Sequence, residues 1–181
     1  MSEQPDTMSL KIIVTGPFSS GKTEFIRAVS ETKVISVDVP QNPKSIVLAM
    51  DYGHIKADRD TTIILLGTSS GRRFSFDGPI TKKFLLGYVI MVDSAYPGTF
   101  REAKSMIEAF KVLVREPYVV AANKQDKDGA WPVDDLRIAL RIPSEIPIVP
   151  CIVTDKESVK LVLVTLLDEV LKRMAADKQD V

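Results

Sequence analysis

The eight residues GPFSSGKT, at positions 16–23, constrain the fold more than any other part of the sequence. They match the pattern GxxxxGK[ST] and directly follow the apolar run LKIIVTG, the strand, loop and helix context in which this pattern binds phosphate. Glycines at both ends let the loop wrap closely, so that backbone N–H groups can point at phosphate oxygens beside the N-terminus of a helix. The sequence therefore predicts a phosphate-binding loop that leads into a helix over residues 21–30.

Two side chains of this loop add specific chemistry. Lys22 supplies a positive charge for the β and γ phosphates, and Thr23 supplies a hydroxyl oxygen for Mg²⁺, which prefers oxygen ligands. A glycine-rich turn that only caps a helix is the alternative, and the spacing after a strand disfavours it. The other nucleotide-binding residues predicted in the loop are Gly16, Ser19, Ser20 and Gly21.

Compact apolar runs alternate with segments of helical period along the whole chain, which is typical of a mostly parallel sheet with helices on its faces. The predicted class is α/β, a three-layer sandwich of the P-loop NTPase type with about five helices. Helical period is clearest over residues 98–115 and 157–175, and a short irregular helix is predicted within 74–87. The six predicted strands are 10–16, 45–55, 61–67, 88–94, 117–124 and 146–152. The link between the second and third is too short for a crossover helix, so these two should form an antiparallel hairpin.

The fifth predicted strand ends in NKQD, residues 123–126, at the edge of the sheet where doubly wound folds bind ligands. A guanine offers two donors, N1–H and N2–H₂, that one carboxylate accepts together, so Asp126 would select guanine over adenine. The stem of Lys124 can lie over the base, and Asn123 can bond the purine edge or tie this loop to the phosphate loop. NKxD alone is a common surface turn, but its place about a hundred residues after the phosphate loop favours a base site.

The chain resembles the Ras-like small GTPase superfamily in four segments that occur in the family's order. They are the phosphate loop GPFSSGKT, the hairpin MDYGHI then TTIILLGT, the segment GTSSGRRF, and NKQD. The likeness is to a bacterial and archaeal branch similar to the gliding-motility GTPases and the Arf and Rab proteins, and it spans about residues 10–174. It implies a six-stranded sheet with one antiparallel strand, and GTP/GDP and Mg²⁺ as ligands. The family's SAK element, beside the base, maps onto Ile152, Val153 and Thr154, so backbone contacts at Val153 are implied there.

The sequence departs from the family at two places that matter for hydrolysis. Relatives carry DxxGQ after the third strand, where the acid holds a magnesium-bound water and the glutamine positions the attacking water. One alignment puts Gly67 at the acid and Gly71 at the glutamine, and a second puts Thr68 and Arg72 there; neither keeps the carboxylate or the glutamine. The switch-loop threonine that ligates magnesium is also missing, with Ser45 as the nearest hydroxyl. Slow hydrolysis is therefore expected.

Arg72 is the candidate catalytic residue, because a cation near the γ-phosphate acts like an arginine finger supplied in cis. Solvated arginines at 72 and 73 on a mobile loop are the alternative. Asp51 could reach magnesium, although a hairpin carboxylate is usually solvated. His54 is the single histidine and is expected on the surface of a strand. Trp131 is expected to pack at the start of a helix.

The leading hypothesis is a guanine-nucleotide-binding molecular switch with slow or partner-dependent GTP hydrolysis. The alternative is a non-catalytic pseudoGTPase that serves as a protein-interaction module. An ATP-dependent phosphotransferase lacks an evident acceptor site and disagrees with NKQD. Segments 39–52 and 67–78 are expected to change order with the γ-phosphate and to face protein partners, and the resemblance suggests a roadblock-type regulator among them.

Composition and charge set the remaining expectations. A length of 181 residues fits one domain, predicted over 10–176 between a flexible N-terminal tail, 1–9, and a C-terminal tail, 177–181. Lysine plus arginine equal aspartate plus glutamate at 24 each, so no overall positive field favours nucleic acid. The chain has no membrane-length apolar run or lipidation motif, which predicts no intrinsic membrane anchor. The single cysteine, Cys151, agrees with a reducing, cytoplasmic setting.

Overall fold

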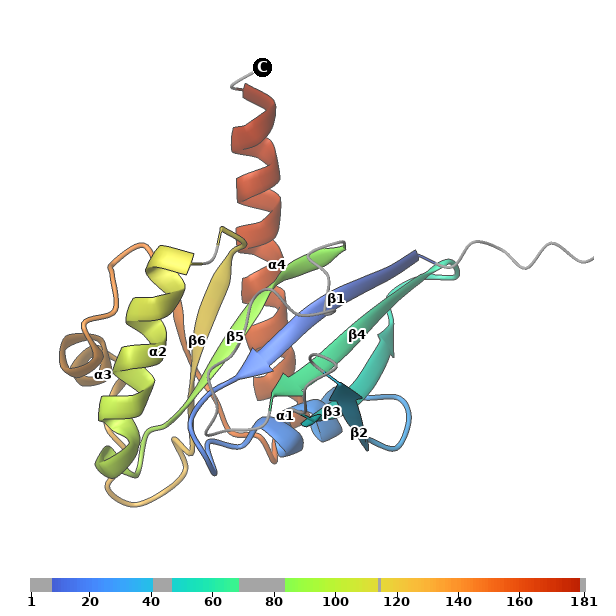
Figure 1. Ribbon diagram of the computed structural model, residues 1–181. Helices are drawn as coiled ribbons and strands as arrows, with labels where there is room; N and C mark the ends of the chain where they lie inside the picture. Colours follow the sequence, from blue (N-terminus) through green and yellow to red (C-terminus); the bar gives the residue numbers. More distant parts are fainter. Residues whose placement is uncertain (1–7, 41–46, 69–83, 114, 180–181) are drawn as a thin grey trace, which may run out of the picture.

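The described residues form one seven-stranded sheet in the order β2-β3-β4-β1-β5-β6-β7. The computed structural model describes residues 8–40, 47–68, 84–113 and 115–179. Figure 1 shows the sheet as the middle layer of the molecule, with helices on both of its faces. The strands are β1 (Met8–Thr15), β2 (Ile35–Pro40), β3 (Val47–Lys56), β4 (Thr61–Thr68), β5 (Leu85–Asp93), β6 (Tyr118–Asn123) and β7 (Ile148–Pro150).

Four α-helices and one 3₁₀ turn are described, and they divide between the two faces of the sheet. They are α1 (Lys22–Val29), the 3₁₀ turn (Pro97–Thr99), α2 (Phe100–Leu113), α3 (Val133–Leu140) and α4 (Lys156–Gln179). The first core cluster joins α1 and α4 to one face, with Phe25 and Leu166 fully buried. The second joins α2 and α3 to the other face, with Ile107 and Leu136 in its centre. The predicted three-layer α/β sandwich is confirmed.

Strand directions place the ligand-binding edge. Among the described strands β3 alone runs against the others, because it pairs antiparallel with both β2 and β4, and the remaining pairs are parallel. The predicted hairpin and single antiparallel strand are therefore confirmed. The carboxyl ends of β1, β4, β5 and β6 meet at one edge, where open α/β sheets bind their ligands.

The predicted count of six strands is wrong, since the sheet has a seventh. The additional strand is β2, which pairs with β3 from Ile35 opposite Tyr52 to Pro40 opposite Val47. Its sequence ISVDV alternates apolar and polar residues, the pattern of a half-buried strand. Part of this stretch was expected to belong to a switch segment, and that expectation overlooked the alternation.

The fifth helix expected within 74–87 falls mainly outside the described residues. Its last part does not form a helix, because β5 already begins at Leu85. The pattern there was less periodic than in the other helices, so its end was poorly defined by sequence.

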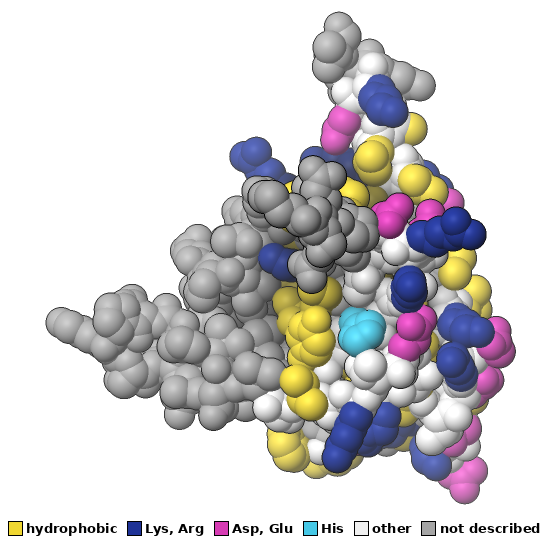
Figure 2. Space-filling view, turned by 90° about the vertical axis from the view of Figure 1, so that its right-hand side faces the viewer, with side chains coloured by type: hydrophobic (Ala, Val, Ile, Leu, Met, Phe, Trp, Pro, Cys, Tyr) yellow, Lys and Arg dark blue, Asp and Glu magenta, His cyan; other side chains and the backbone are white. Residues whose placement is uncertain are grey.

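The surface at the β3 side of the molecule carries mixed charge. Figure 2 shows His54, in cyan, on this surface among side chains of both charge signs. His54 is partly buried, and its Nδ1 lies 3.2 Å from the hydroxyl of Thr32.

No helix among the described residues has the length and apolarity that crossing a membrane requires.

Candidate nucleotide-binding site

The loop from Gly16 to Gly21 joins β1 to α1 and has a backbone that only glycine suits at its two ends. Gly16 has φ 150° and Gly21 has φ 103°, and L-residues with a side chain rarely adopt such positive φ angles. A Cβ on Gly16 would lie 2.4 Å from the carbonyl oxygen of Met91, and one on Gly21 would lie 2.3 Å from Nδ2 of Asn123. The spacing of the two glycines in the sequence is thus a packing requirement as well as a motif.

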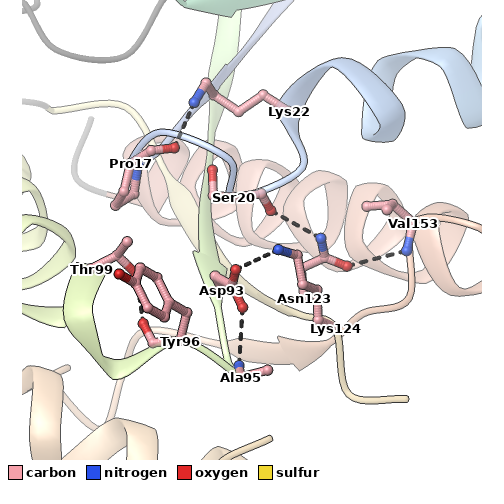
Figure 3. Close-up of polar contacts among 10 residues, drawn as sticks. All are labelled: Pro17, Ser20, Lys22, Asp93, Ala95, Tyr96, Thr99, Asn123, Lys124 and Val153. Atoms are coloured by element: carbon pink, nitrogen blue, oxygen red, sulfur yellow. Dashed lines mark hydrogen bonds and ion pairs between the residues drawn. The ribbon is translucent and has the colours of Figure 1, made fainter. Parts of the chain in front are cut away.

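Lys22, the first residue of α1, folds back over this loop. Its ammonium donates to the carbonyl oxygens of Gly16, at 2.9 Å, and Pro17, at 2.8 Å, as Figure 3 shows for Pro17. Burial lowers the pKa of Lys22 to about 8, and the nearby carboxylates Glu102 and Asp51 work against that shift. The charge of Lys22 is held at the loop in a poorly solvated place, where an anion would compensate it.

Two other loop side chains have contrasting surroundings. Ser20 is fully buried, and its hydroxyl has no hydrogen-bond partner among the described residues. Phe18 is 74% exposed, so its ring is not packed into the core.

Asn123, at the end of β6, joins the phosphate loop to a third loop. Its Nδ2 donates to the carbonyl oxygen of Ser20 at 2.9 Å, and its Oδ1 accepts from the N–H of Val153 at 3.2 Å. The side chain is fully buried, so water does not compete for these bonds. The sequence left two roles open for Asn123, a bond to the purine edge or a connection to the phosphate loop. In the structure its side chain makes the connection between loops (Figure 3).

Lys124 lies next to Asn123 with φ 65°, and its ammonium forms a 2.5 Å ion pair with Oδ2 of Asp93. Asp93 ends β5, is 4% exposed, and accepts the N–H of Ala95 at its other oxygen. The pair fixes the end of the Lys124 side chain at the end of β5. Asp93 was not predicted as a site residue from the sequence, although a carboxylate at the end of a buried strand indicates such a role.

Asp126 lies farther along the same loop and is more open. Its side chain is 36% exposed, and its Oδ2 is 3.1 Å from the ammonium of Lys127. An exposed ion pair of this kind is weak, so the carboxylate of Asp126 can exchange Lys127 for another donor. Asn123, Lys124, Val153 and the phosphate loop are thus brought together, with Asp126 at the open side.

A hydroxyl and a carboxylate meet beside the phosphate loop. Thr23, in the first turn of α1, donates its hydroxyl to Oδ2 of Asp51, which lies on β3. Asp51 stands directly opposite Gly67 of β4 in the sheet register. Asp51 is therefore not simply solvated, contrary to what is usual for a hairpin carboxylate.

Gly67 leaves the space that Asp51 uses. A Cβ on Gly67 would lie 3.2 Å from the Cβ of Asp51 and 2.7 Å from Cδ1 of Ile26. The neighbouring residue Thr68 lies on the opposite face, because successive strand residues alternate, and its hydroxyl donates to Thr15 at 2.9 Å. Neither Gly67 nor Thr68, the two positions that the alignments give for the family's acid, carries a carboxylate, and Asp51 holds one on the neighbouring strand, on the same face as Gly67.

Oxygen ligands at this place suit a hard cation. Magnesium is commonly bound through one or two carboxylates or hydroxyls together with phosphate oxygens and waters. The described residues contain no group of three or more His, Cys, Asp or Glu side chains that could hold a metal alone. Thr23 and Asp51 therefore fit a cation that takes its other ligands from a bound nucleotide and water.

Several predicted positions lie outside the described residues. Arg72, the candidate catalytic residue, is one of them, with most of the segment 67–78 and the hydroxyl of Ser45. Their roles stay predictions.

The loop at residues 16–23, the hydrogen bonds of Asn123 and the open sheet edge are typical of an α/β fold of the P-loop type. No protein-family model matches the chain. The chain is 29% identical over 143 residues to the human protein "ADP-ribosylation factor-like protein 9". The aligned region covers 76% of this chain and 71% of that protein. The structure is similar to that of the Arl6 (BBS3) small GTPase from Trypanosoma brucei with bound GppNp. The TM-score is 0.62, with 20% sequence identity, over 91% of this chain and 99% of that one. Sequence similarity and fold similarity therefore both support the predicted resemblance to the Ras-like small GTPase superfamily.

Proposed function

We propose that the protein binds guanine nucleotides with a divalent cation and acts as a molecular switch. The observation that carries this proposal is the pair of hydrogen bonds that Asn123 makes to Ser20 and Val153. They hold the predicted phosphate loop and the predicted base loop in one fixed arrangement, so that one ligand can contact both. The small GTPase relatives support the same reading.

The base is proposed to be guanine because of Asp126. Its carboxylate is the acceptor that the two donors of guanine, N1–H and N2–H₂, require together. Lys124 would place its stem along one face of the base, since its ammonium is already fixed on Asp93. The backbone around Val153 would close the other side.

The cation is proposed to lie at Thr23 and Asp51. A magnesium ion there would neutralise charge on the β and γ phosphates, and Lys22 would contribute a second positive charge from the loop. Thr23 would turn its hydroxyl hydrogen away from Asp51 and offer a lone pair. In this proposal Asp51 supplies the carboxylate that Gly67 does not.

Hydrolysis is proposed to be slow or dependent on a partner. The sequence has no glutamine within residues 67–74 to orient an attacking water, and positioning that water is a main part of this catalysis. Arg72 remains the candidate for a positive charge near the γ-phosphate. A partner, of which a roadblock-type regulator is one candidate, could supply the missing group.

The direct test is the affinity for GDP and GTP of the wild type, Lys22→Ala and Asp126→Ala, with Asp128→Ala as a control on the same loop. We expect both site variants to lose at least tenfold in affinity, because each removes a charged contact worth about 1.5 to 3 kcal/mol. GDP binding should be nearly unchanged in the control Asp128→Ala. Added ATP should compete only weakly with GDP in the wild type. Equal affinity in the wild type and both site variants would refute the proposal.

The second candidate, a non-catalytic pseudoGTPase, is favoured by the same lack of a glutamine. A single-turnover assay with GTP and Mg²⁺ separates the two candidates. Phosphate release above the protein-free rate supports a slow enzyme. Tight GTP binding without release, also with partners added, supports the interaction module.

A further inference from the structure

Strand β2 contributes a side chain to the proposed cation site. The hydroxyl of Ser36 donates to Oδ1 of Asp51 at 2.8 Å, while the hydroxyl of Thr23 donates to Oδ2 of the same carboxylate. Each oxygen of Asp51 thus has one partner, and the two partners come from different elements, β2 and α1. The carboxylate is held from both sides.

The sheet register explains why these groups meet. Ser36 is paired with Asp51, Asp51 with Gly67, and Gly67 with Val14, in one row across β2, β3, β4 and β1. Residues paired across strands place their side chains on the same face. The missing side chain at Gly67 leaves Asp51 room to lie between its two hydroxyl partners.

A carboxylate on a short stem can turn about two bonds, and a cation requires one particular orientation. A hydrogen bond to one oxygen limits that rotation and leaves the other oxygen for the metal. Residues that orient a metal ligand in this way typically change metal affinity 10–100-fold when they are removed. The donor here meets a charged acceptor, which makes the bond stronger than one between neutral groups.

We propose that Ser36 is a positioning residue for the cation, and that strand β2 is thereby part of the metal site. This inference rests on the proposed function. In the described sheet β2 is an edge strand that pairs only with β3. Because coupling between two sites is reciprocal, a cation that binds better when Ser36 is in place also stabilises the pairing of β2 with β3.

The test compares the wild type with Ser36→Ala, Ser36→Thr and Asp51→Ala, with Ser105→Ala, on the exposed part of α2, as the matched control. The first measurement is the Mg²⁺ concentration that half-suppresses release of a fluorescent GDP. We expect Ser36→Ala to raise that concentration about tenfold, with release in EDTA unchanged. Ser36→Thr and Ser105→Ala should behave as the wild type, since the threonine keeps a hydroxyl.

The second measurement is hydrogen exchange of the amides in β2, with GDP present and Mg²⁺ added or removed. We expect Mg²⁺ to slow this exchange in the wild type and to have little effect in Ser36→Ala. A wild type without Mg²⁺-dependent GDP binding would overturn the proposed function and this inference together. If Asp51→Ala loses the Mg²⁺ dependence while Ser36→Ala matches the wild type in both measurements, only the role of Ser36 is overturned.

Discussion

At the scale of single residues, Lys22 shows that burying a charged side chain at the candidate site can cost stability. The lysine is 8% exposed, and burial lowers its pKa from 10.5 to about 8. Holding it charged in the folded protein therefore costs roughly 3 kcal/mol. The two hydrogen bonds to Gly16 and Pro17 recover part of this cost.

We predict that Lys22→Met stabilises the nucleotide-free protein at pH 7 by about 1 to 2 kcal/mol, while it abolishes nucleotide binding. This corresponds to an increase in Tm of about 2 to 8 °C. The measurement is thermal unfolding without nucleotide. A lower Tm for the variant would mean that the charge of Lys22 stabilises the empty loop.

The same residue predicts a pH dependence. Between pH 8 and about 10.5 the unfolded chain still holds the lysine proton that the folded protein has released, so the stability of the wild type rises with pH in this window. The stability advantage of Lys22→Met should therefore shrink from pH 8 to pH 10. Urea unfolding of both proteins at these pH values checks this, and a constant difference would contradict it.

At the scale of elements, the end of β6 holds three loops together through Asn123. We predict that Asn123→Ala destabilises the nucleotide-free protein by about 2 to 3 kcal/mol, because the carbonyl of Ser20 and the N–H of Val153 lose their partner. Gln125→Ala is the control, since its bond to the carbonyl of Trp131 is exposed, and should cost less than about 1 kcal/mol. Equal losses in urea unfolding would show that the tie is not important.

The row of residues across β3 and β4 predicts that the cation carboxylate can act from either strand. Gly67→Asp alone should bring two like charges opposite each other and crowd Ile26, which destabilises the sheet. The double variant Gly67→Asp with Asp51→Gly removes the repulsion and the 3.2 Å contact between the two Cβ atoms, although the contact with Ile26 remains. It should regain Mg²⁺-dependent GDP binding that Asp51→Gly loses. The readout is GDP release against Mg²⁺ concentration. A double variant no better than Asp51→Gly would contradict this prediction.

These elements also show how far the sequence leads. The phosphate loop and the NKQD loop were predictable because each motif lies within a few adjacent residues. The contact of Asp51 with Thr23 was not, because it depends on the register of β3 against β4, which the pattern of residues does not define. The contact of Ser36 with Asp51 could not be predicted for the same reason, and also because β2 was not predicted as a strand. Asn123 was predicted as a site residue, but only the structure shows that its side chain connects two loops.

At the scale of the whole molecule, one edge of the sheet carries the candidate site, and α4 continues past the opposite end. Figure 1 shows the C-terminal turns of α4 projecting beyond the sheet. Val170 is the last buried residue of this helix, and residues 171–178 are all exposed. The end of α4 therefore adds little to the core.

We predict that a chain ending at residue 176 keeps its fold and its nucleotide affinity, with a stability loss below about 1 kcal/mol. The ion pair of Arg173 with Asp177 is exposed and contributes little. Urea unfolding and GDP titration of the shortened chain measure this. A loss above 2 kcal/mol would show that the last residues belong to the domain.

We propose that one site holds a guanine nucleotide and a cation through the phosphate loop, Asp126, Thr23 and Asp51. The most direct measurement is a crystal structure with GDP and Mn²⁺, in which anomalous scattering locates the metal. We expect the phosphates against residues 16–23, the base on Asp126, and the manganese beside Thr23, bound by Asp51 directly or through one water. A nucleotide bound elsewhere, or a metal that Asp51 does not approach, would contradict it.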